Sequence, residues 1–188
     1  MADHQRDLGS LYSWWRGDEL PELPDIPGLR VHRLDDVTNP PRLFDLNPAR
    51  WRLRIQQGHL PYMATLEGDP AAYGWVATRE AEIGELDIHI VLGPREYYLW
   101  DFWTVPQYRG RRIYPQLLQA IISDLLPSGD AFWIGHGPGN DASRSGIERA
   151  GFREVLWIVD TPNGVFAIPI DRERSARASQ LLGIPILP

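Results

Sequence analysis

The sequence predicts a mixed α/β or α+β domain in which helices flank a central sheet of about seven strands. Short apolar or alternating runs bounded by Gly, Pro, Asn and Asp recur along the chain, as expected for strands. Later strands are separated by amphipathic helical segments, so antiparallel strands precede strand–helix–strand units. At 188 residues, the chain has the length of one ordinary domain rather than two.

Residues 1–28 are predicted to form a Pro-rich arm or cover, followed by the main domain over residues 29–188. Their last part is the run LPELPDIPG, where each proline removes a backbone donor and restricts its neighbour, so regular helix is excluded. Tyr12, Trp14 and Trp15 would be costly to leave in water, and we expect them to pack onto the domain. A substrate lid is the alternative.

The first half of the main domain is expected to contain one helix among short strands. A strand is predicted at residues 29–34 and a helix at residues 47–57, with Asn47 as N-cap and Pro48 in its first position. Three strands should follow, at residues 62–66, 71–78 and 85–91. In the third, Glu85, Asp87 and His89 alternate with apolar residues and would share one polar face, either solvated or in an active site.

The second half is predicted to contain a buried central strand followed by alternating helices and strands. Residues 97–105 are almost wholly apolar or aromatic apart from Asp101, as expected for a strand covered on both faces. Apolar residues then recur at helical spacing from Ile113 to Leu125. Further strands are expected at residues 131–135, 154–160 and 165–170, and helices at residues 141–150 and 171–182.

Composition excludes several classes of function. The net charge of −6 opposes a broad nucleic-acid or anionic-membrane surface. The chain has no cysteine, which removes disulfide and thiolate sites and suits a reducing compartment, so a cytoplasmic location is expected. No stretch approaches the roughly 18 apolar residues of a membrane span, and no histidine spacing indicates a metal site.

One basic segment stands at a strand–helix junction, between Val105 and Ile113. Backbone N–H groups and the helix dipole favour an anion at such a junction. Gly110 lets the backbone approach a ligand, and three arginines add positive charge to an acidic chain: Arg109, Arg111 and Arg112. The segment therefore indicates a phosphate-binding loop, with a solvated basic turn as the alternative.

The run VPQYRGRRIY resembles the coenzyme A loop of the GNAT superfamily of N-acetyltransferases, whose pattern is Gln/Arg-x-x-Gly-x-Gly/Ala. Gln107 and Gly110 match this pattern, whereas Arg112 stands where a small residue is usual. A second block, from Asn140 to Phe152, resembles the family's later segment of an Asn, a short helix and a Gly-Phe pair. Together with the order of elements, the resemblance covers roughly three quarters of the chain.

The resemblance implies a GNAT-like fold and transfer of an acetyl group from acetyl-CoA to an amine of a small molecule or protein. It implies that the end of the central strand holds pantetheine and that the loop holds the pyrophosphate. The implied cofactor-binding residues are Phe102, Trp103, Thr104, Val105, Arg109, Gly110, Arg111, Arg112, Ile113, Tyr114, Asn140 and Ser143. An alternative role for Asn140 is to cap the helix that follows it.

The general acid is not assigned by the resemblance, because Ile147 stands where many relatives carry a tyrosine. Tyr114, Ser143, water or no residue could protonate the leaving thiolate. For the base, Asp101 is the first candidate, because burying a lone carboxylate in a central strand would be expensive. An ion pair with an arginine, or a wetted position, is the alternative.

Other candidates for the base are less specific. Glu85, Asp87 and His89 form a second group, and His136 lies in a glycine-rich loop close to Asn140. A non-catalytic acyl-CoA-binding module is the second hypothesis for the whole chain. Nucleic-acid binding by the three arginines is a third, disfavoured by the acidic balance. The oligomeric state is open, and a homodimer is compatible with the sequence.

Overall fold

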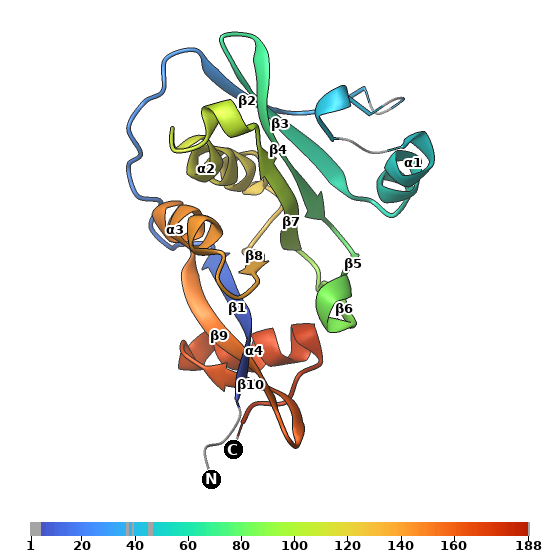
Figure 1. Cartoon of the computed structure of the whole chain (residues 1–188), viewed down its shortest axis with the longest axis vertical. Coiled ribbons are helices and arrows are strands. Elements are labelled where there is room, and N and C mark those ends of the chain that lie inside the picture. Colours follow the sequence, from blue (N-terminus) through green and yellow to red (C-terminus); the bar gives the residue numbers. More distant parts are fainter. Residues whose placement is uncertain (1–4, 37, 39, 45–46, 188) are drawn as a thin grey trace.

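A computed structural model of the chain describes residues 5–36, 38, 40–44 and 47–187. Its main strands are β1 (Arg6–Trp15), β2 (Leu29–Arg33), β3 (Leu60–Leu66), β4 (Asp69–Ala77), β7 (Glu96–Thr104), β8 (Ala131–His136), β9 (Arg153–Thr161) and β10 (Gly164–Pro169). They form one sheet in the order β10-β9-β1-β8-β7-β4-β3-β2 (Figure 1). Neighbouring strands are antiparallel, except that β7 and β8 run parallel. The predicted mixed sheet is confirmed, with eight strands rather than about seven.

Four α-helices flank this sheet in the described part of the chain: α1 (Pro48–Gln56), α2 (Ile113–Leu125), α3 (Asp141–Arg149) and α4 (Arg172–Leu182). Figure 1 shows α2 and α3 on one side of the sheet and α1 and α4 on the other. The predicted cap of α1 is confirmed, because the Asn47 side chain accepts hydrogen bonds from the amides of Ala49 and Arg50.

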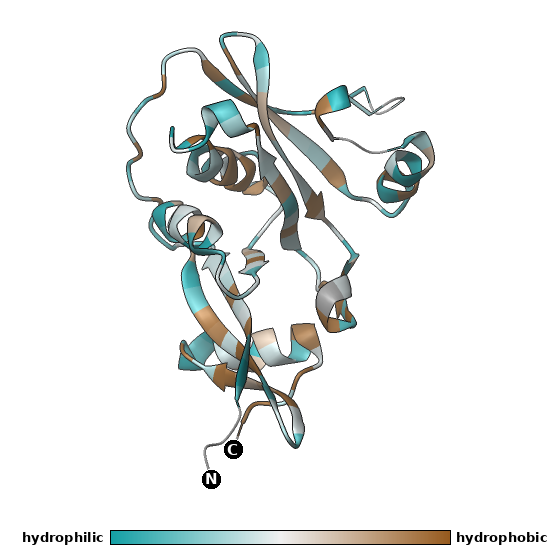
Figure 2. Cartoon of the chain, in the orientation of Figure 1, coloured by the Kyte–Doolittle hydropathy of each residue, from teal (hydrophilic) through white to brown (hydrophobic). Residues whose placement is uncertain are grey.

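Strand alternation divides the core between the two faces of the sheet. In β8, Phe132 and Ile134 pack in the cluster beneath α2 and α3, whereas Trp133 belongs to the cluster beneath α4. Hydrophobic colour in Figure 2 is correspondingly striped along the strands and gathers along one side of α2, while α1 is mainly hydrophilic. Trp51 is the buried residue of α1 and packs edge-on against Trp75 of β4, with ring centres 4.9 Å apart.

The N-terminal segment departs from the prediction of an arm. Residues 6–15 form β1, an inner strand that pairs with β8 on one edge and β9 on the other. A Cβ on Gly9 would lie 2.1 Å from the carbonyl oxygen of His136, so glycine permits this close approach. The prolines that suggested an arm begin only at Pro21. From there the chain does cover α2, because the Gln119 side chain donates to the Pro21 carbonyl at 2.8 Å.

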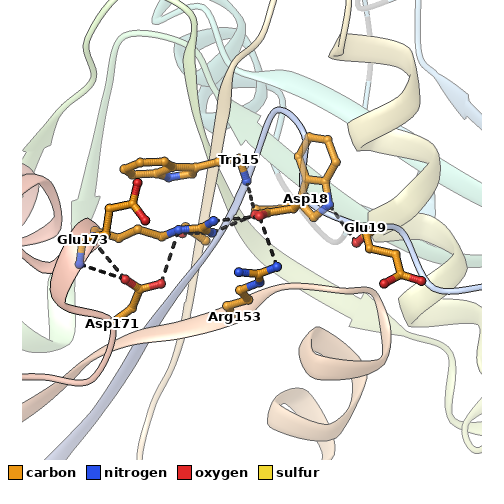
Figure 3. Close-up of polar contacts among 9 residues, drawn as sticks. Trp15, Asp18, Glu19, Arg153, Asp171 and Glu173 are labelled. Carbon is orange, nitrogen blue, oxygen red and sulfur yellow. Dashed lines mark hydrogen bonds and ion pairs between the residues drawn. The ribbon is translucent and has the colours of Figure 1, made fainter.

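An ion-pair network ties the end of β1 to α4. The Asp18 carboxylate, just after β1, receives two hydrogen bonds of 2.7 Å from Arg174 of α4. It also accepts from the Trp15 amide at 2.7 Å and pairs with Arg153 at 3.5 Å (Figure 3). The Asp18 and Arg174 side chains are only 8% and 7% exposed, so the network fixes the N-terminal strand inside the domain.

The predicted strand at residues 85–91 is shorter than expected. The structure has a hairpin of β5 (Glu80–Ile83) and β6 (Ile88–Val91), joined through the 3₁₀ helix η2 (Gly84–Leu86). Asp87 follows η2 with a left-handed φ of 52°, so the expected polar face does not form. His89 lies beside Glu80 of the partner strand, at 3.6 Å. The side chain of Glu85 lies outside the described residues.

Candidate functional site

The sheet opens between its two parallel strands. β7 and β8 pair from Glu96 and Ala131 up to Leu99 and Ile134, and no further. Beyond that point β7 still pairs with β4, so residues 100–104 keep one edge bonded and turn the other edge toward the opening. Such an edge offers backbone N–H and C=O groups to a ligand that carries amides.

A β-bulge lies where the strands separate. Trp75 of β4 faces Trp100 of β7, but Tyr73 faces Trp103, so the two β7 residues between them have only Gly74 opposite. Asp101 adopts a φ of 51° in this bulge. The Phe102 ring covers Gly74, where an added Cβ would lie 2.0 Å from Phe102 Cε1. A glycine is therefore required opposite the bulge.

The predicted phosphate loop follows β7 directly. The 3₁₀ helix η3 (Pro106–Tyr108) leads to Gly110 and Arg112, whose φ values are 76° and 62°, and α2 begins at Ile113. Among the described residues, none accepts a hydrogen bond from the backbone amides of residues 110–112. The first turn of α2 adds further unpaired amides and the positive end of the helix dipole. The loop thus has the features of an anion site.

A cavity of about 390 Å³ opens above this loop and contains most of the predicted cofactor-binding residues. Ten of the twelve line it: Phe102, Trp103, Thr104, Arg109, Gly110, Arg112, Ile113, Tyr114, Asn140 and Ser143. Val105 and Arg111 do not. The Val105 amide donates to the Ala71 carbonyl at 2.9 Å, and the Arg111 guanidinium lies over the Tyr108 ring, 5.6 Å from its centre.

Sequence reasoning missed the wall of this cavity that α3 contributes. Ala142, Ser145, Gly146 and Arg149 line it beside Ser143. They occupy one face of a helix at spacings of three and four residues, so a signal was present once Asn140 was taken as its cap. The Asn140 side chain does accept from the Ser143 amide at 3.1 Å, which confirms the cap while the residue also lines the cavity.

Tyr114 fills the space that the small residue Gly146 leaves open. A Cβ at position 146 would lie 2.3 Å from Tyr114 Cδ1, so the ring rests directly on the backbone of α3. The Tyr114 hydroxyl lies 3.4 Å from the Ser143 hydroxyl. Burial raises the pKa of Tyr114 to about 12, with the bond to Ser143 opposing the shift. At neutral pH this hydroxyl is therefore protonated and able to donate.

A larger cleft of about 1210 Å³ lies on the other side of the opening. It is walled by α1, the β5–β6 hairpin, β1 and the ends of β7 and β8. Four residues line both the cleft and the smaller cavity: Phe102, Tyr114, Asn140 and Ser143. The two spaces therefore meet at the point where the sheet opens.

A comparison with protein families decides the affiliation of the chain. Residues 23–152, more than half of the chain, match the model described as "Acetyltransferase (GNAT) family". The chain belongs to this family. No curated protein matches it.

Solved GNAT structures share its fold at low sequence identity. An aminoglycoside acetyltransferase AAC(6')-Ib, in complex with coenzyme A and kanamycin, is 18% identical with a TM-score of 0.54, covering 79% of this chain and 98% of that one. A GNAT acetyltransferase from Colwellia psychrerythraea is 14% identical with a TM-score of 0.55, covering 82% and 55%. A GCN5-related N-acetyltransferase from Sphaerobacter thermophilus is 11% identical with a TM-score of 0.59, covering 80% and 50%.

The lengths of these GNAT proteins differ. This chain spans only 62%, 55% and 56% of the length of three matching structures, including those from Novosphingobium aromaticivorans and Kribbella flavida. At such identities the likeness establishes the fold. Activity and substrates must be argued from the residues of this site.

Ile147, where the resemblance implies a tyrosine in many relatives, is part of the core in this chain. Ile147 is fully buried beneath α3 and does not line the cavity. The tyrosine ring beside α3 comes instead from α2, as Tyr114. Tyr114 therefore places a phenolic hydroxyl near the opening, from α2 rather than α3.

Asp101 is neither buried nor alone, in contrast to the expectation for a central strand. The strand opens on one side at this point, and the Asp101 side chain is 34% exposed in the cleft. Its Oδ2 lies 2.5 Å from Nη1 of Arg54 of α1. Asp101 therefore forms an ion pair with an arginine at a solvent-accessible position, as the alternative prediction stated.

The remaining candidates for a base either lie outside both cavities or have hydrogen-bond partners within the fold. Asp87 and His89 line neither cavity. His136 does line the cleft, but its Nδ1 lies 2.9 Å from the Gly137 carbonyl and its Nε2 lies 3.4 Å from the Tyr12 hydroxyl. Both ring nitrogens therefore have partners within the fold. In the described ranges, no cluster of three metal-ligating side chains occurs, and no helix is long and apolar enough to cross a membrane.

Proposed function

We propose that this chain is an acetyl-CoA-dependent N-acetyltransferase acting on an amine of a small molecule or protein. The observation that carries the proposal is the meeting of the two cavities at Phe102, Tyr114, Asn140 and Ser143. Transfer between two substrates requires such a meeting point, because the reacting atoms must be held in contact. The structure of AAC(6')-Ib with coenzyme A and kanamycin supports a small-molecule amine as acceptor.

The smaller cavity fits coenzyme A. The free amides after Gly110 would hold the pyrophosphate, and no atom lies within 4 Å of a Cβ built on Gly110, which leaves room for it. Arg109 and Arg112 line the same space and add positive charge. Phe102, Trp103 and Thr104 offer the free strand edge to the pantetheine amides, and Asn140 and Ser143 face it from α3.

Bound acetyl-CoA supplies an acetyl group on a thioester. As the amine nitrogen bonds to the acetyl carbon, the carbon–sulfur bond breaks, and one proton must reach the sulfur while one leaves the nitrogen. We assign the first proton to the Tyr114 hydroxyl, which is protonated at neutral pH and lies beside Ser143. We assign the second to the carboxylate of Asp101 in the cleft.

A direct test combines binding and turnover. Isothermal titration should show binding of coenzyme A and acetyl-CoA, and thiol release from acetyl-CoA should exceed background with at least one amine. The panel should include an aminoglycoside, a polyamine, an arylalkylamine and a lysine peptide, so that the acceptor classes are separated. A folded protein with no affinity for either cofactor form contradicts the proposal.

A non-catalytic acyl-CoA-binding module is the second candidate, favoured by one observation. Ile147, where the resemblance implies a tyrosine in many relatives, is fully buried. In that case coenzyme A would bind, yet thiol release would stay at background with every amine of the panel.

The composition also bears on the location and partners that we propose for the protein. We propose a cytoplasmic location, supported by the absence of cysteine, because a reducing compartment imposes no need for disulfides. Nucleic acid is not a proposed partner, because Arg111 stacks on Tyr108 and the net charge is −6. A homodimer remains compatible with the proposal.

A further inference from the structure

Asp101 adopts a backbone conformation that needs support from its surroundings. Its φ of 51° lies in the left-handed region, which is unfavourable for a residue with a Cβ. It belongs to the bulge that also positions Phe102, a residue lining both cavities. Any group that holds Asp101 therefore acts at the point where the two cavities meet.

Arg54 is the group that holds it, and Arg54 is itself held on several sides. Its guanidinium carbon lies 4.3 Å from the centre of the Trp100 ring and 5.0 Å from that of Trp75. The Trp100 indole is fixed in turn, because its N–H donates to Nδ1 of buried His59 at 3.1 Å. The Arg54 side chain is only 13% exposed. This arrangement presents Nη1 to Asp101 in one fixed position.

The ion pair occupies only one of the two carboxylate oxygens. Oδ2 of Asp101 receives the Arg54 hydrogen bond, and among the described residues no hydrogen-bond donor reaches Oδ1. Asp101 and Arg54 both line the larger cleft. One oxygen is therefore anchored to α1 while the other is left for a ligand in the cleft.

We propose that Arg54 is a positioning residue for the transfer reaction. By anchoring Oδ2, it orients the carboxylate of Asp101 so that Oδ1 meets the acceptor amine and receives its proton. The inference rests on the proposed function and adds a residue of α1 to it. Arg54 acts through Asp101, so its contribution disappears once the Asp101 carboxylate is removed.

A double-mutant cycle tests this dependence. Arg54→Met should lower kcat by about tenfold and leave the Kd for coenzyme A within about twofold of that of the unaltered protein, because Arg54 does not line the cofactor cavity. The double variant Arg54→Met/Asp101→Asn should be no slower than Asp101→Asn alone. Additive losses in kcat would overturn the proposal. Arg52→Met is the matched control, since Arg52 lies on the same helix, donates to the Pro48 carbonyl and lines neither cavity.

The variant Asp101→Gly tests the contribution of the carboxylate independently of that of the bulge. Glycine adopts the left-handed conformation without strain, so this variant keeps the backbone geometry and loses only the charged group. The kcat of Asp101→Gly should fall as far as that of Asp101→Asn, with coenzyme A binding preserved. Full activity in Asp101→Gly would show that the ion pair serves only the bulge, and would overturn the proposal.

Hydrogen exchange provides a reading that does not depend on turnover. The backbone amides of residues 100–103 should exchange faster in Arg54→Met than in Arg52→Met, because the bulge loses its anchor. Equal exchange in the two variants would contradict the positioning role, even in a protein that acetylates no amine of the panel. An inactive unaltered protein would contradict the proposed function and with it the part of Arg54 in transfer, whereas the anchoring of Asp101 by Arg54 would still be decided by hydrogen exchange.

Discussion

The two cavities that meet at the open end of the sheet are built in different ways. The smaller cavity, which we propose for the cofactor, is lined by residues from two short stretches, 102–115 and 140–149, and the anion site proposed in it uses backbone amides. The larger cleft, which we propose for the acceptor, takes side chains from α1, β1, the β5–β6 hairpin, β7 and β8. A site made of main chain can be recognised by its glycines and local spacing. A site made of side chains that are distant in the sequence leaves no local motif.

A substitution in the predicted phosphate loop should have the largest effect on ligand binding. Gly110→Val would place a branched side chain in the open space at Gly110, so coenzyme A binding should weaken by about a thousandfold or more, as expected when charge-assisted hydrogen bonds to a phosphate are lost. Titration calorimetry measures this loss.

Gly68→Val is the matched control for Gly110→Val. Gly68 also has a positive φ, of 94°, with open space around it, but it lies in the β3–β4 turn and lines neither cavity. Both variants should lose similar stability from backbone strain. A normal Kd for coenzyme A in Gly110→Val would show that the loop does not hold the pyrophosphate.

The same contrast explains which parts of the fold and of the candidate site can be predicted from the sequence. The loop at Gly110 and the cap at Asn140 can be predicted because each depends on residues within a few positions, and the structure confirms the cap. The order of strands and helices can be predicted from hydrophobic periodicity. Arg54 and Asp101 lie 47 residues apart, and nothing in either local pattern pairs them. The sequence predicts a buried central strand around Asp101, because periodicity does not specify where β7 and β8 stop pairing.

β1 was missed for a related reason. The prolines after residue 20 suggested an irregular arm, but the strand that precedes them is stabilised by pairing with β8 and β9, more than 100 residues away in the sequence. The third predicted strand was too long because the Gly84–Leu86 turn reads as a continuation of the alternating pattern. Local patterns cannot report a partner strand that is distant in the chain.

Removing the Tyr114 hydroxyl should produce a smaller loss, at the boundary between the two cavities. Tyr114→Phe should lower kcat about a hundredfold, the lower end of the range for general acid catalysis, and leave coenzyme A affinity unchanged. The defect should shrink with 4-nitrothiophenyl acetate as donor, because its thiolate is stable without a proton. An equal defect with both donors would contradict the role of Tyr114 as proton donor.

Tyr97→Phe is the control for Tyr114→Phe. The Tyr97 hydroxyl also lies beside a serine hydroxyl, that of Ser128, at 2.9 Å. It stands at the opposite end of β7 and lines neither cavity. The kcat of Tyr97→Phe should match that of the unaltered protein. A lower kcat would mean that losing any tyrosine–serine hydrogen bond reduces activity.

Lowering the pH should affect the larger cleft, which is lined by side chains, more than the loop of backbone amides at the smaller cavity. We expect this to be the smallest of the predicted effects. His59 accepts a hydrogen bond from Trp100, which lines the larger cleft. Burial lowers the pKa of His59 to about 4, and the charge of Arg54 lowers it further than the opposing charge of Glu80 raises it. Between pH 6.5 and pH 4 the unfolded chain binds a proton at His59 and the folded chain does not. The stability that depends on neutral His59 is therefore complete above pH 6.5 and is lost as the pH falls toward 4.

This linkage should cost about 2 kcal/mol of unfolding free energy between pH 7.5 and pH 5. Urea titrations of His59→Gln should show a correspondingly weaker pH dependence, because glutamine can still accept the Trp100 hydrogen bond but has no proton to gain. His32→Gln removes an exposed histidine of β2 and should leave the dependence unchanged. Protonation of His59 in the folded chain also removes the acceptor that fixes Trp100, so the KM for the acceptor should rise as the pH falls toward 4, before coenzyme A affinity changes. Equal pH sensitivity of the KM for the acceptor and of coenzyme A affinity would contradict a role of His59 that is confined to the larger cleft.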